Sequence, residues 1–231
     1  MPKGNELAEF AQEKVKINKN VLEKKFNNHL KQLIDIEFEI YQDWEDKCSI
    51  EIIKEAIRKN LIKDAGNFEN TLIKNYELIR EFYLSISQSR KSRAGKSFEN
   101  HVKYLFNLLD YPFETQTQLN GIIDYLIPGE EAYRKNRTSC VVISIKRTLR
   151  ERWRQTVGEL SSTNAGRIYL LTADTKISIG KVDEMKKNNV NLVVWDKDKK
   201  SKFSDRYNVL GYTQFISVDL PSTSKLWESL V

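Results

Sequence analysis

Apolar positions divide the chain into two parts. Up to about residue 90 they recur at steps of three and four, the period of a helix that faces a core. From about residue 113 they gather into short runs bounded by turn residues, which predict buried strands. We therefore expect a helical N-terminal region over residues 1–87 and an α/β core over residues 88–231.

The first part is predicted to hold separate amphipathic helices. One carries Phe26 and Leu30, a second begins with Ser49 as its cap, and a third carries Phe68, Leu72 and Tyr83. The polar, basic stretch SISQSRKSRAGKSFEN that follows is expected to be a flexible linker. A further helix is expected from about residue 96 to residue 109.

The second part alternates strands with helices. Residues 113–119 and 122–127 predict a hairpin, because Asn120-Gly121 between them is a strong two-residue turn signal. A charged loop is expected over 128–137. A strand is predicted over 139–146, a helix over 149–160 and a strand over 168–173, and this order implies a right-handed crossover and parallel pairing. The remaining expectations are a helix at 181–188, a strand at 192–195, an edge strand at 214–218 and a helix at 221–230.

Composition narrows the class of protein. The 231 residues carry a net charge of +6 and a pI near 9.1, which suits a polyanionic partner. Two cysteines and two histidines make a disulfide framework or a zinc site unexpected. No apolar run is long enough for a membrane span, and the first ten residues lack the apolar core of a signal peptide. We expect a cytoplasmic protein without a membrane partner.

Two charged residues stand in apolar runs. Asp124 lies within Ile122-Ile123-Asp124-Tyr125-Leu126-Ile127, and Lys146 ends Val141-Val142-Ile143-Ser144-Ile145-Lys146. Charges that reach a sheet edge from buried strands often serve chemistry. Taken singly, Asp124 could equally be a satisfied core carboxylate and Lys146 a strand-end lysine that extends to water.

An Arg-Glu-Arg triplet, Arg150-Glu151-Arg152, follows this lysine, and Glu159 comes thirteen residues after it. In this order the residues resemble the PD-(D/E)XK nucleases. Within them they resemble the CCGG-type branch of type II restriction endonucleases, to which EcoRII, SsoII and PspGI belong. The resemblance covers residues 88–194. It implies a restriction-endonuclease-like core, a central mixed β-sheet flanked by helices.

The resemblance also implies a set of catalytic residues. Asp124, Lys146, Glu159 and an upstream Glu99 correspond to the catalytic positions of the branch, and the three carboxylates would bind Mg²⁺, a hard cation that prefers oxygen ligands. Whether Lys146 acts as a base or as an electrostatic positioner stays open. Ser144 departs from the superfamily pattern, which has Asp or Glu there, but Glu159 stands at the branch's alternative position. Ile123 replaces a proline that ligates nothing.

DNA contacts are implied as well. Arg150 and Arg152 would each pair with a guanine and Glu151 with cytosine, which suits adjacent G·C pairs. Gln88 would reach the minor groove. Lys91, Arg93 and Lys96 are expected to touch phosphates, which position without specifying sequence. Trp44 and Tyr41 are candidates for holding an extruded central base.

The function implied is a Mg²⁺-dependent type II restriction endonuclease that acts on double-stranded DNA as a homodimer. The helical N-terminal region, residues 1–87, is expected to provide dimer contacts and to clamp the DNA. It would cut a palindromic CC/GG site of the CCNGG, CCWGG or CCGG type, leave 5′-phosphate ends with a 5′ overhang, and have a cognate DNA methyltransferase. Two other functions stay open. Ser144 favours a DNA-binding protein without catalysis, and the fold would also suit a repair or structure-specific nuclease.

Overall fold

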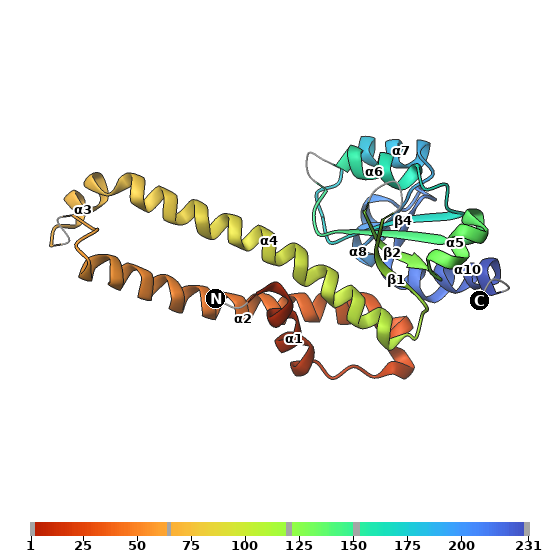
Figure 1. Cartoon of the computed structure of the whole chain (residues 1–231), viewed down its shortest axis with the longest axis horizontal. Coiled ribbons are helices and arrows are strands. Elements are labelled where there is room, and N and C mark those ends of the chain that lie inside the picture. The colour runs from red at the N-terminus through yellow and green to blue at the C-terminus, as the bar shows by residue number, and fades with distance from the viewer. Residues whose placement is uncertain (1–2, 64–65, 119–121, 150–152, 229–231) are drawn as a thin grey trace. The chain divides into compact units, whose positions relative to one another are not determined.

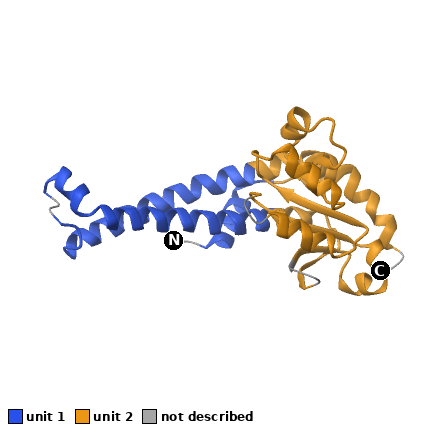
Figure 2. Ribbon diagram, turned by 90° about the horizontal axis from the view of Figure 1, so that it is seen from above, with its two compact units in different colours: residues 1–16, 32–101 blue, residues 17–31, 102–231 orange. Residues whose placement is uncertain are grey.

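A computed structural model describes residues 3–63, 66–118, 122–149 and 153–228. The chain divides into two compact units, coloured separately in Figure 2. Unit 1 comprises residues 1–16 and 32–101, and unit 2 comprises residues 17–31 and 102–231.

Unit 1 is built from helices. They are α1 (Gly4–Lys14), most of α2 (Leu22–Arg58), α3 (Phe68–Lys74) and most of α4 (Tyr76–Leu108) (Figure 1). Helix α1 packs closely on α4, since Ser97 Oγ donates to the carbonyl of Gly4 at 2.9 Å. A Cβ atom added to Gly4 would lie 3.0 Å from the carbonyl oxygen of Arg93, so the backbones meet there.

Two of the helical predictions are wrong in detail. The stretch expected to be a flexible linker is the middle of α4, and Ser49 caps nothing because it lies inside α2. Polarity was taken for flexibility, but α4 contains no proline to interrupt its backbone hydrogen bonds. Gly95 alone lowers its helix propensity only modestly.

The helix expected to run from Phe68 to Tyr83 is instead broken at Asn75. The side chain of Asn75 accepts from the backbone N–H of Lys63 at 2.9 Å. Its amide donates to the carbonyls of Lys63 at 2.8 Å and Thr71 at 2.7 Å. Among the described residues from 46 to 96, Asn75 is the only buried one. This part of unit 1 therefore holds its turn through polar contacts and has no buried apolar side chain of its own.

Unit 2 is organised around a six-stranded sheet in the order β1-β2-β3-β4-β5-β6. The strands are β1 (Glu114–Gln118), β2 (Ile122–Ile127), β3 (Val141–Lys146), β4 (Arg167–Thr172), β5 (Asn191–Val194) and β6 (Val209–Gly211). The first two pairings are antiparallel and the last three are parallel. The predicted hairpin and the predicted parallel crossover are confirmed, whereas the turn Asn120-Gly121 lies outside the described residues.

The C-terminal edge differs from the prediction. Residues 214–218 are helical rather than an edge strand: α9 (Tyr212–Gln214) leads into the π-helix η3 (Phe215–Asp219) and α10 (Leu220–Trp227). Phe215, Ile216 and Leu220 are buried at helical spacing, which outweighs their strand propensity. The expected loop at 128–137 also contains a helix, α5 (Glu130–Lys135).

Each face of the sheet packs against its own set of side chains. Helices α6 (Trp153–Ser161) and α7 (Ile179–Lys187) lie side by side over one face (Figure 1). They close a core with Val142, Leu170 and Leu192 of the strands. The other face is aromatic, with ring centroids 5.6 Å apart for Phe106–Tyr125, 4.8 Å for Tyr169–Phe215 and 6.0 Å for Phe26–Tyr212.

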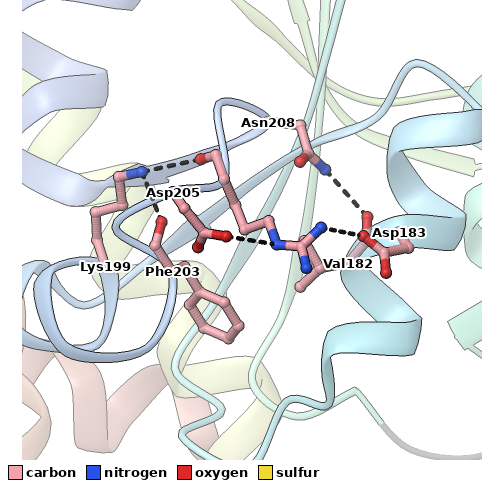
Figure 3. A network of polar contacts seen from close by, with 7 residues as sticks. Val182, Asp183, Lys199, Phe203, Asp205 and Asn208 are labelled. Carbon is pink, nitrogen blue, oxygen red and sulfur yellow. Dashed lines mark hydrogen bonds and ion pairs between the residues drawn. The ribbon is translucent and has the colours of Figure 1, made fainter.

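A polar network fixes α7 to the segment between α8 (Asp196–Lys202) and β6 (Figure 3). Arg206 donates to the Asp183 carboxylate at 2.6 Å, and Asn208 donates to the carbonyl of Val182 at 3.1 Å. Lys199 donates to the carbonyls of Phe203 and Arg206 at 2.8 and 2.9 Å. Arg206 and Asn208 thus tie α7 to this segment, and Lys199 stabilises the segment itself.

None of the helices within the described ranges combines the length and the apolar character that crossing a bilayer requires.

Gly166, the residue before β4, packs closely against the backbone of Thr138, and its substitution tests this contact. A Cβ atom there would lie 1.8 Å from the carbonyl oxygen of Thr138, and backbone cannot yield as a flexible side chain does. We expect Gly166→Ala to lower the free energy of unfolding by about 1–3 kcal/mol or more in urea titrations. Gly158→Ala is the matched control in α6, where no atom lies within 4 Å of the new methyl group, and it is expected to stabilise by about 0.5–1 kcal/mol. Equal stability of the two variants would contradict the close approach.

Candidate active site

The site begins where the β2–β3 ladder stops. The pairing runs from Ile127↔Val141 to Tyr125↔Ile143, and the same register would next place Asp124 opposite Ser144. That backbone pair is absent from the ladder of described residues. Instead the carboxylate of Asp124 accepts the backbone N–H of Ile145 at 2.6 Å. The Asp124 side chain thus replaces the main-chain acceptor that β2 would provide. Beyond this point β3 pairs only with β4 among the described strands.

Two further donors converge on the same carboxylate oxygen. Asp124 Oδ2 also accepts from Ser144 Oγ at 2.9 Å and from Lys146 Nζ at 3.3 Å. The Asp124 side chain is 13% exposed and that of Lys146 39% exposed. The structure therefore brings together the carboxylate and the ammonium group that the sequence singled out, at a partly open edge of the sheet.

Ser144, where the superfamily pattern has an acidic residue, holds Asp124 in place. Its side chain is almost fully buried, and its hydroxyl donates to Asp124. A short hydroxyl donor and a backbone N–H both have little rotational freedom, so they fix the carboxylate better than the flexible lysine does. Ser144 supports the orientation of Asp124 and supplies no charge of its own.

The backbone beside the site is strained. Gln116 of β1 lies across from Asp124 in the register between Thr115↔Tyr125 and Thr117↔Ile123. Its φ of 56° is in the left-handed region, which costs a non-glycine residue about 1–3 kcal/mol. Both neighbours of Asp124 in the sheet thus depart from regular strand pairing, and such departures gather at functional sites.

The donor set fits a hard cation. The contacts that the described residues make with Asp124 all end on Oδ2, and Oδ1 takes none of them. Carboxylate oxygen is a ligand that Mg²⁺ accepts together with water and substrate phosphate. No histidine or cysteine stands among these contacts, so the chemistry fits Mg²⁺ better than Zn²⁺.

Glu159 lies on α6, beside the face that Trp153, Val157 and Leu160 bury in the core. Its carboxylate accepts from Gln155 Nε2 at 2.8 Å, one helical turn away. Over the described ranges no group of three or more His, Cys, Asp or Glu side chains is arranged to hold a metal ion. The pairing of Asp124 and Glu159 as metal ligands stays a prediction.

The remaining sequence-derived contacts belong to α4 of unit 1. Gln88 and Lys91 are exposed, Arg93 stacks over the Tyr41 ring at 5.5 Å, and Lys96 pairs with Glu99 at 3.8 Å. Arg93, Lys96 and Glu99 share one helix face because they are three residues apart. They stand on a helix and not on the expected linker. Glu99 belongs to unit 1 and Asp124 to unit 2, so its role as a third ligand stays a prediction.

The two aromatic candidates for a base pocket differ in their surroundings. Trp44 is 42% exposed, whereas Tyr41 is buried and bonded to the carboxylate of Glu45. Arg90 holds the same carboxylate with bidentate geometry, its Nε donating at 3.0 and 2.8 Å, and this bond lowers the pKa of Glu45. Burial, followed by the bond to Glu45, raises the pKa of Tyr41 to about 12. Tyr41 is thus committed to a structural cluster, and Trp44 is the more accessible ring.

The Arg-Glu-Arg triplet, residues 150–152, lies outside the described residues. The segment leading to it is anchored by residues that the sequence analysis did not single out. Thr172 Oγ1 donates to the carbonyl of Arg147 at 3.3 Å, and Asp174 Oδ2 accepts the N–H of Leu149 at 2.9 Å. Their positions in the sequence could have indicated this role: Thr172 ends β4 and Asp174 follows it, and β4 is the parallel neighbour of the strand that ends in Lys146.

Known proteins resemble this chain over most of its length. A family model described as EcoRII C terminal matches residues 50–216. The type II restriction enzyme SsoII of Shigella sonnei is 26% identical over 205 residues, covering 82% of this chain and 66% of that enzyme. The type II restriction enzyme EcoRII of Escherichia coli is 33% identical over 116 residues, covering 48% of this chain and 28% of that enzyme. The chain thus spans less than two thirds of the length of each.

The fold is shared with a solved structure. Metal-depleted Ecl18kI in complex with uncleaved, modified DNA superimposes with a TM-score of 0.85 at 22% identity. The match covers all of this chain and 80% of that one. At this identity it establishes the fold, and it confirms the predicted mixed sheet flanked by helices with a helical N-terminal region.

Proposed function

This chain belongs to the EcoRII C-terminal family, and on that premise we propose that it is a type II restriction endonuclease for double-stranded DNA. The observation that carries the proposal is the Asp124–Lys146 pair, 3.3 Å apart where β2 and β3 part. A carboxylate can help to hold a divalent cation, and an ammonium group beside it can stabilise the charge that phosphodiester hydrolysis develops on the phosphate.

Each residue has a proposed task in the hydrolysis. Mg²⁺, when bound, supplies charge stabilisation at the phosphate and an acidified water. Asp124 would hold it through Oδ1, with Glu159 and Glu99 as the other ligands. Lys146 stands within contact of Asp124 and would keep a positive charge beside the scissile phosphate, whether it positions the water or accepts its proton.

Recognition is assigned to the Arg-Glu-Arg triplet. Bidentate contacts from its arginines to guanine and acceptance by its glutamate from cytosine suit a CC/GG half-site of a CCNGG, CCWGG or CCGG palindrome. Two copies of the chain would then read two half-sites. Gln88, Lys91, Arg93 and Lys96 of α4 would contact the minor groove and phosphates. The products would carry 5′-phosphates and a 5′ overhang, in a cytoplasm where a cognate methyltransferase protects the host.

A DNA-binding protein without catalysis is the second candidate. Two observations favour it: across the described ranges no three His, Cys, Asp or Glu side chains are grouped to hold a metal ion, and Glu159 accepts a hydrogen bond from Gln155. Magnesium dependence separates the two candidates, since a binder retards a CCNGG duplex with or without metal and never nicks it.

Digestion of phage DNA tests the proposal directly. With Mg²⁺ the wild-type chain should give discrete bands whose mapped ends flank CC/GG sites, and chelation by EDTA should abolish them. Asp124→Asn removes the negative charge that a cation needs. It should lower the cleavage rate at least about 100-fold, while a gel-shift assay still shows the specific complex.

Glu131→Gln is the control for a change of charge, because that side chain is 85% exposed and pairs with Lys135 one turn away. It should leave cleavage unchanged. Smeared or intact DNA from the wild-type chain, or normal cleavage by Asp124→Asn, would remove the proposal.

We further propose that the distal part of unit 1, residues 46–87, makes contacts in the homodimer. Several apolar side chains there are exposed without a core of their own: Ile50, Ile52, Ile53, Ile57, Leu61, Phe68, Leu72, Ile73, Tyr76, Leu78, Tyr83 and Leu84. The segment has seven Lys or Arg and seven Asp or Glu residues, so its formal charge is zero although the chain carries +6. A neutral apolar surface suits a second copy better than DNA.

Sedimentation tests the dimer contact. Ile53 and Ile57 are 43% and 45% exposed and one turn apart on α2. The double variant Ile53→Glu/Ile57→Glu should therefore keep its fold and sediment as a monomer where the wild type is a dimer. Asp43→Lys, on the same helix but outside residues 46–87 and 61% exposed, is the control that should stay dimeric. A double variant that remains dimeric would place the interface elsewhere.

A further inference from the structure

Leu149, the residue before the Arg-Glu-Arg triplet, is held at both of its backbone polar groups by side chains. Its N–H donates to Asp174 Oδ2 at 2.9 Å, and its carbonyl accepts from Lys181 Nζ at 2.6 Å. Its own side chain is buried at 3% exposure. Two side-chain hydrogen bonds and a buried side chain thus restrain the backbone of Leu149, although loops are usually more mobile than the elements they connect.

Lys181 also contacts the residue after the triplet. Its ammonium group lies 5.8 Å from the ring centroid of Trp153, a cation–π distance. Trp153 is the first residue of α6 and is only 7% exposed. One lysine therefore contacts both chain ends from which residues 150–152 extend.

The helix that carries Lys181 is itself fixed. On the same face of α7, one turn later, Glu184 accepts from Arg154 Nε at 3.0 and 3.2 Å, and the Arg154 guanidinium stacks over Trp153 at 5.0 Å. The opposite support comes from Arg206 on Asp183 and Asn208 on the carbonyl of Val182, drawn in Figure 3. Lys181 therefore lies on a helix, α7, that contacts on both sides hold in place.

Asp174 is braced in the same way. Its Oδ1 accepts the N–H of Lys176 at 2.8 Å, and its own N–H donates to Thr172 Oγ1 at 3.1 Å. Thr172 pairs in register with Lys146 across β3 and β4. The residue that anchors Leu149 thus follows the end of β4, the strand whose last residue pairs with Lys146.

We propose that Lys181, assisted by Asp174, is a positioning residue for DNA sequence discrimination: it ties the two ends of residues 150–152 so that the triplet meets G·C edges in one register. The inference rests on the proposed function, because it assigns to that site the residues that set its specificity. Bidentate contacts to a base need a donor pair placed to within a fraction of an ångström. A triplet held only by its own backbone would lose that precision, while phosphate contacts on α4 would be unaffected.

The test compares discrimination rather than activity alone. The readout is the ratio of affinities, measured without metal, for a CCNGG duplex and for the same duplex with both G·C pairs inverted. Lys181→Met keeps the length of the side chain and removes the donor, and it should lower this ratio about tenfold or more by weakening only the cognate complex. Lys187→Met, exposed on the same helix, is the matched control and should keep the ratio of the wild type.

A conservative pair guards against loss of folding. Lys181→Arg retains a donor and Asp174→Asn retains an acceptor, so both should keep most of the ratio, whereas Asp174→Ala should lower it as Lys181→Met does. Thermal unfolding of each variant shows that the fold is kept. A uniform weakening on both duplexes, or an unchanged ratio in Lys181→Met, overturns the inference.

The binding readout separates this inference from the proposed function. A wild-type chain that discriminates the two duplexes but does not cleave refutes catalysis and leaves the role of Lys181 to be decided by its variants. A wild-type chain without discrimination refutes both.

Discussion

A carboxylate that replaces a backbone acceptor is the interaction on which the candidate active site depends. Where β2 and β3 part, the N–H of Ile145 would lose its strand partner, and Asp124 takes that N–H at 2.6 Å. A buried backbone donor without a partner costs about 1–3 kcal/mol, so the bond has a structural value independent of chemistry. The same bond orients Oδ2 inward and leaves Oδ1 for another ligand. Asp124 therefore both ends the β2–β3 pairing and forms the first part of the candidate active site.

The period of the apolar residues predicted much of unit 2 because strands and helices alternate there with clear turn signals. Where the predicted secondary structure was wrong, the cause was tertiary burial or the absence of a residue that interrupts a helix. Residues 214–218 have strand propensity but bury Phe215 and Ile216 as a helix. The polar residues before Ser97 continue as helix α4 because nothing in them interrupts it. Asn75 breaks a predicted helix through three side-chain bonds to the backbone, and such bonds have no periodic signature.

The candidate site was predictable to the extent that charge stood out against apolar surroundings. Asp124 and Lys146 did, and the structure brings them together. Thr172, Asp174 and Lys181 bind main-chain atoms of a neighbouring loop. Every residue has these atoms, so the sequence does not show which residues are the partners. Their contacts with Arg147 and Leu149 depend on how the ends of β3 and β4 lie side by side in the folded sheet. Glu99 and Glu159 were assigned by resemblance, and the geometry of the described residues leaves that assignment as a proposal.

The segment around Asn75 has a consequence for the order in which the molecule gains structure. Because none of the described apolar side chains between residues 46 and 96 is buried, the helices there are supported mainly by local bonds and surface ion pairs, which are worth a few tenths of a kcal/mol each. Amide protons in this stretch should exchange with solvent long before those of β3 and β4, which are buried in the core of unit 2. The stretch is then expected to be the last part of unit 1 to fold and the first to unfold.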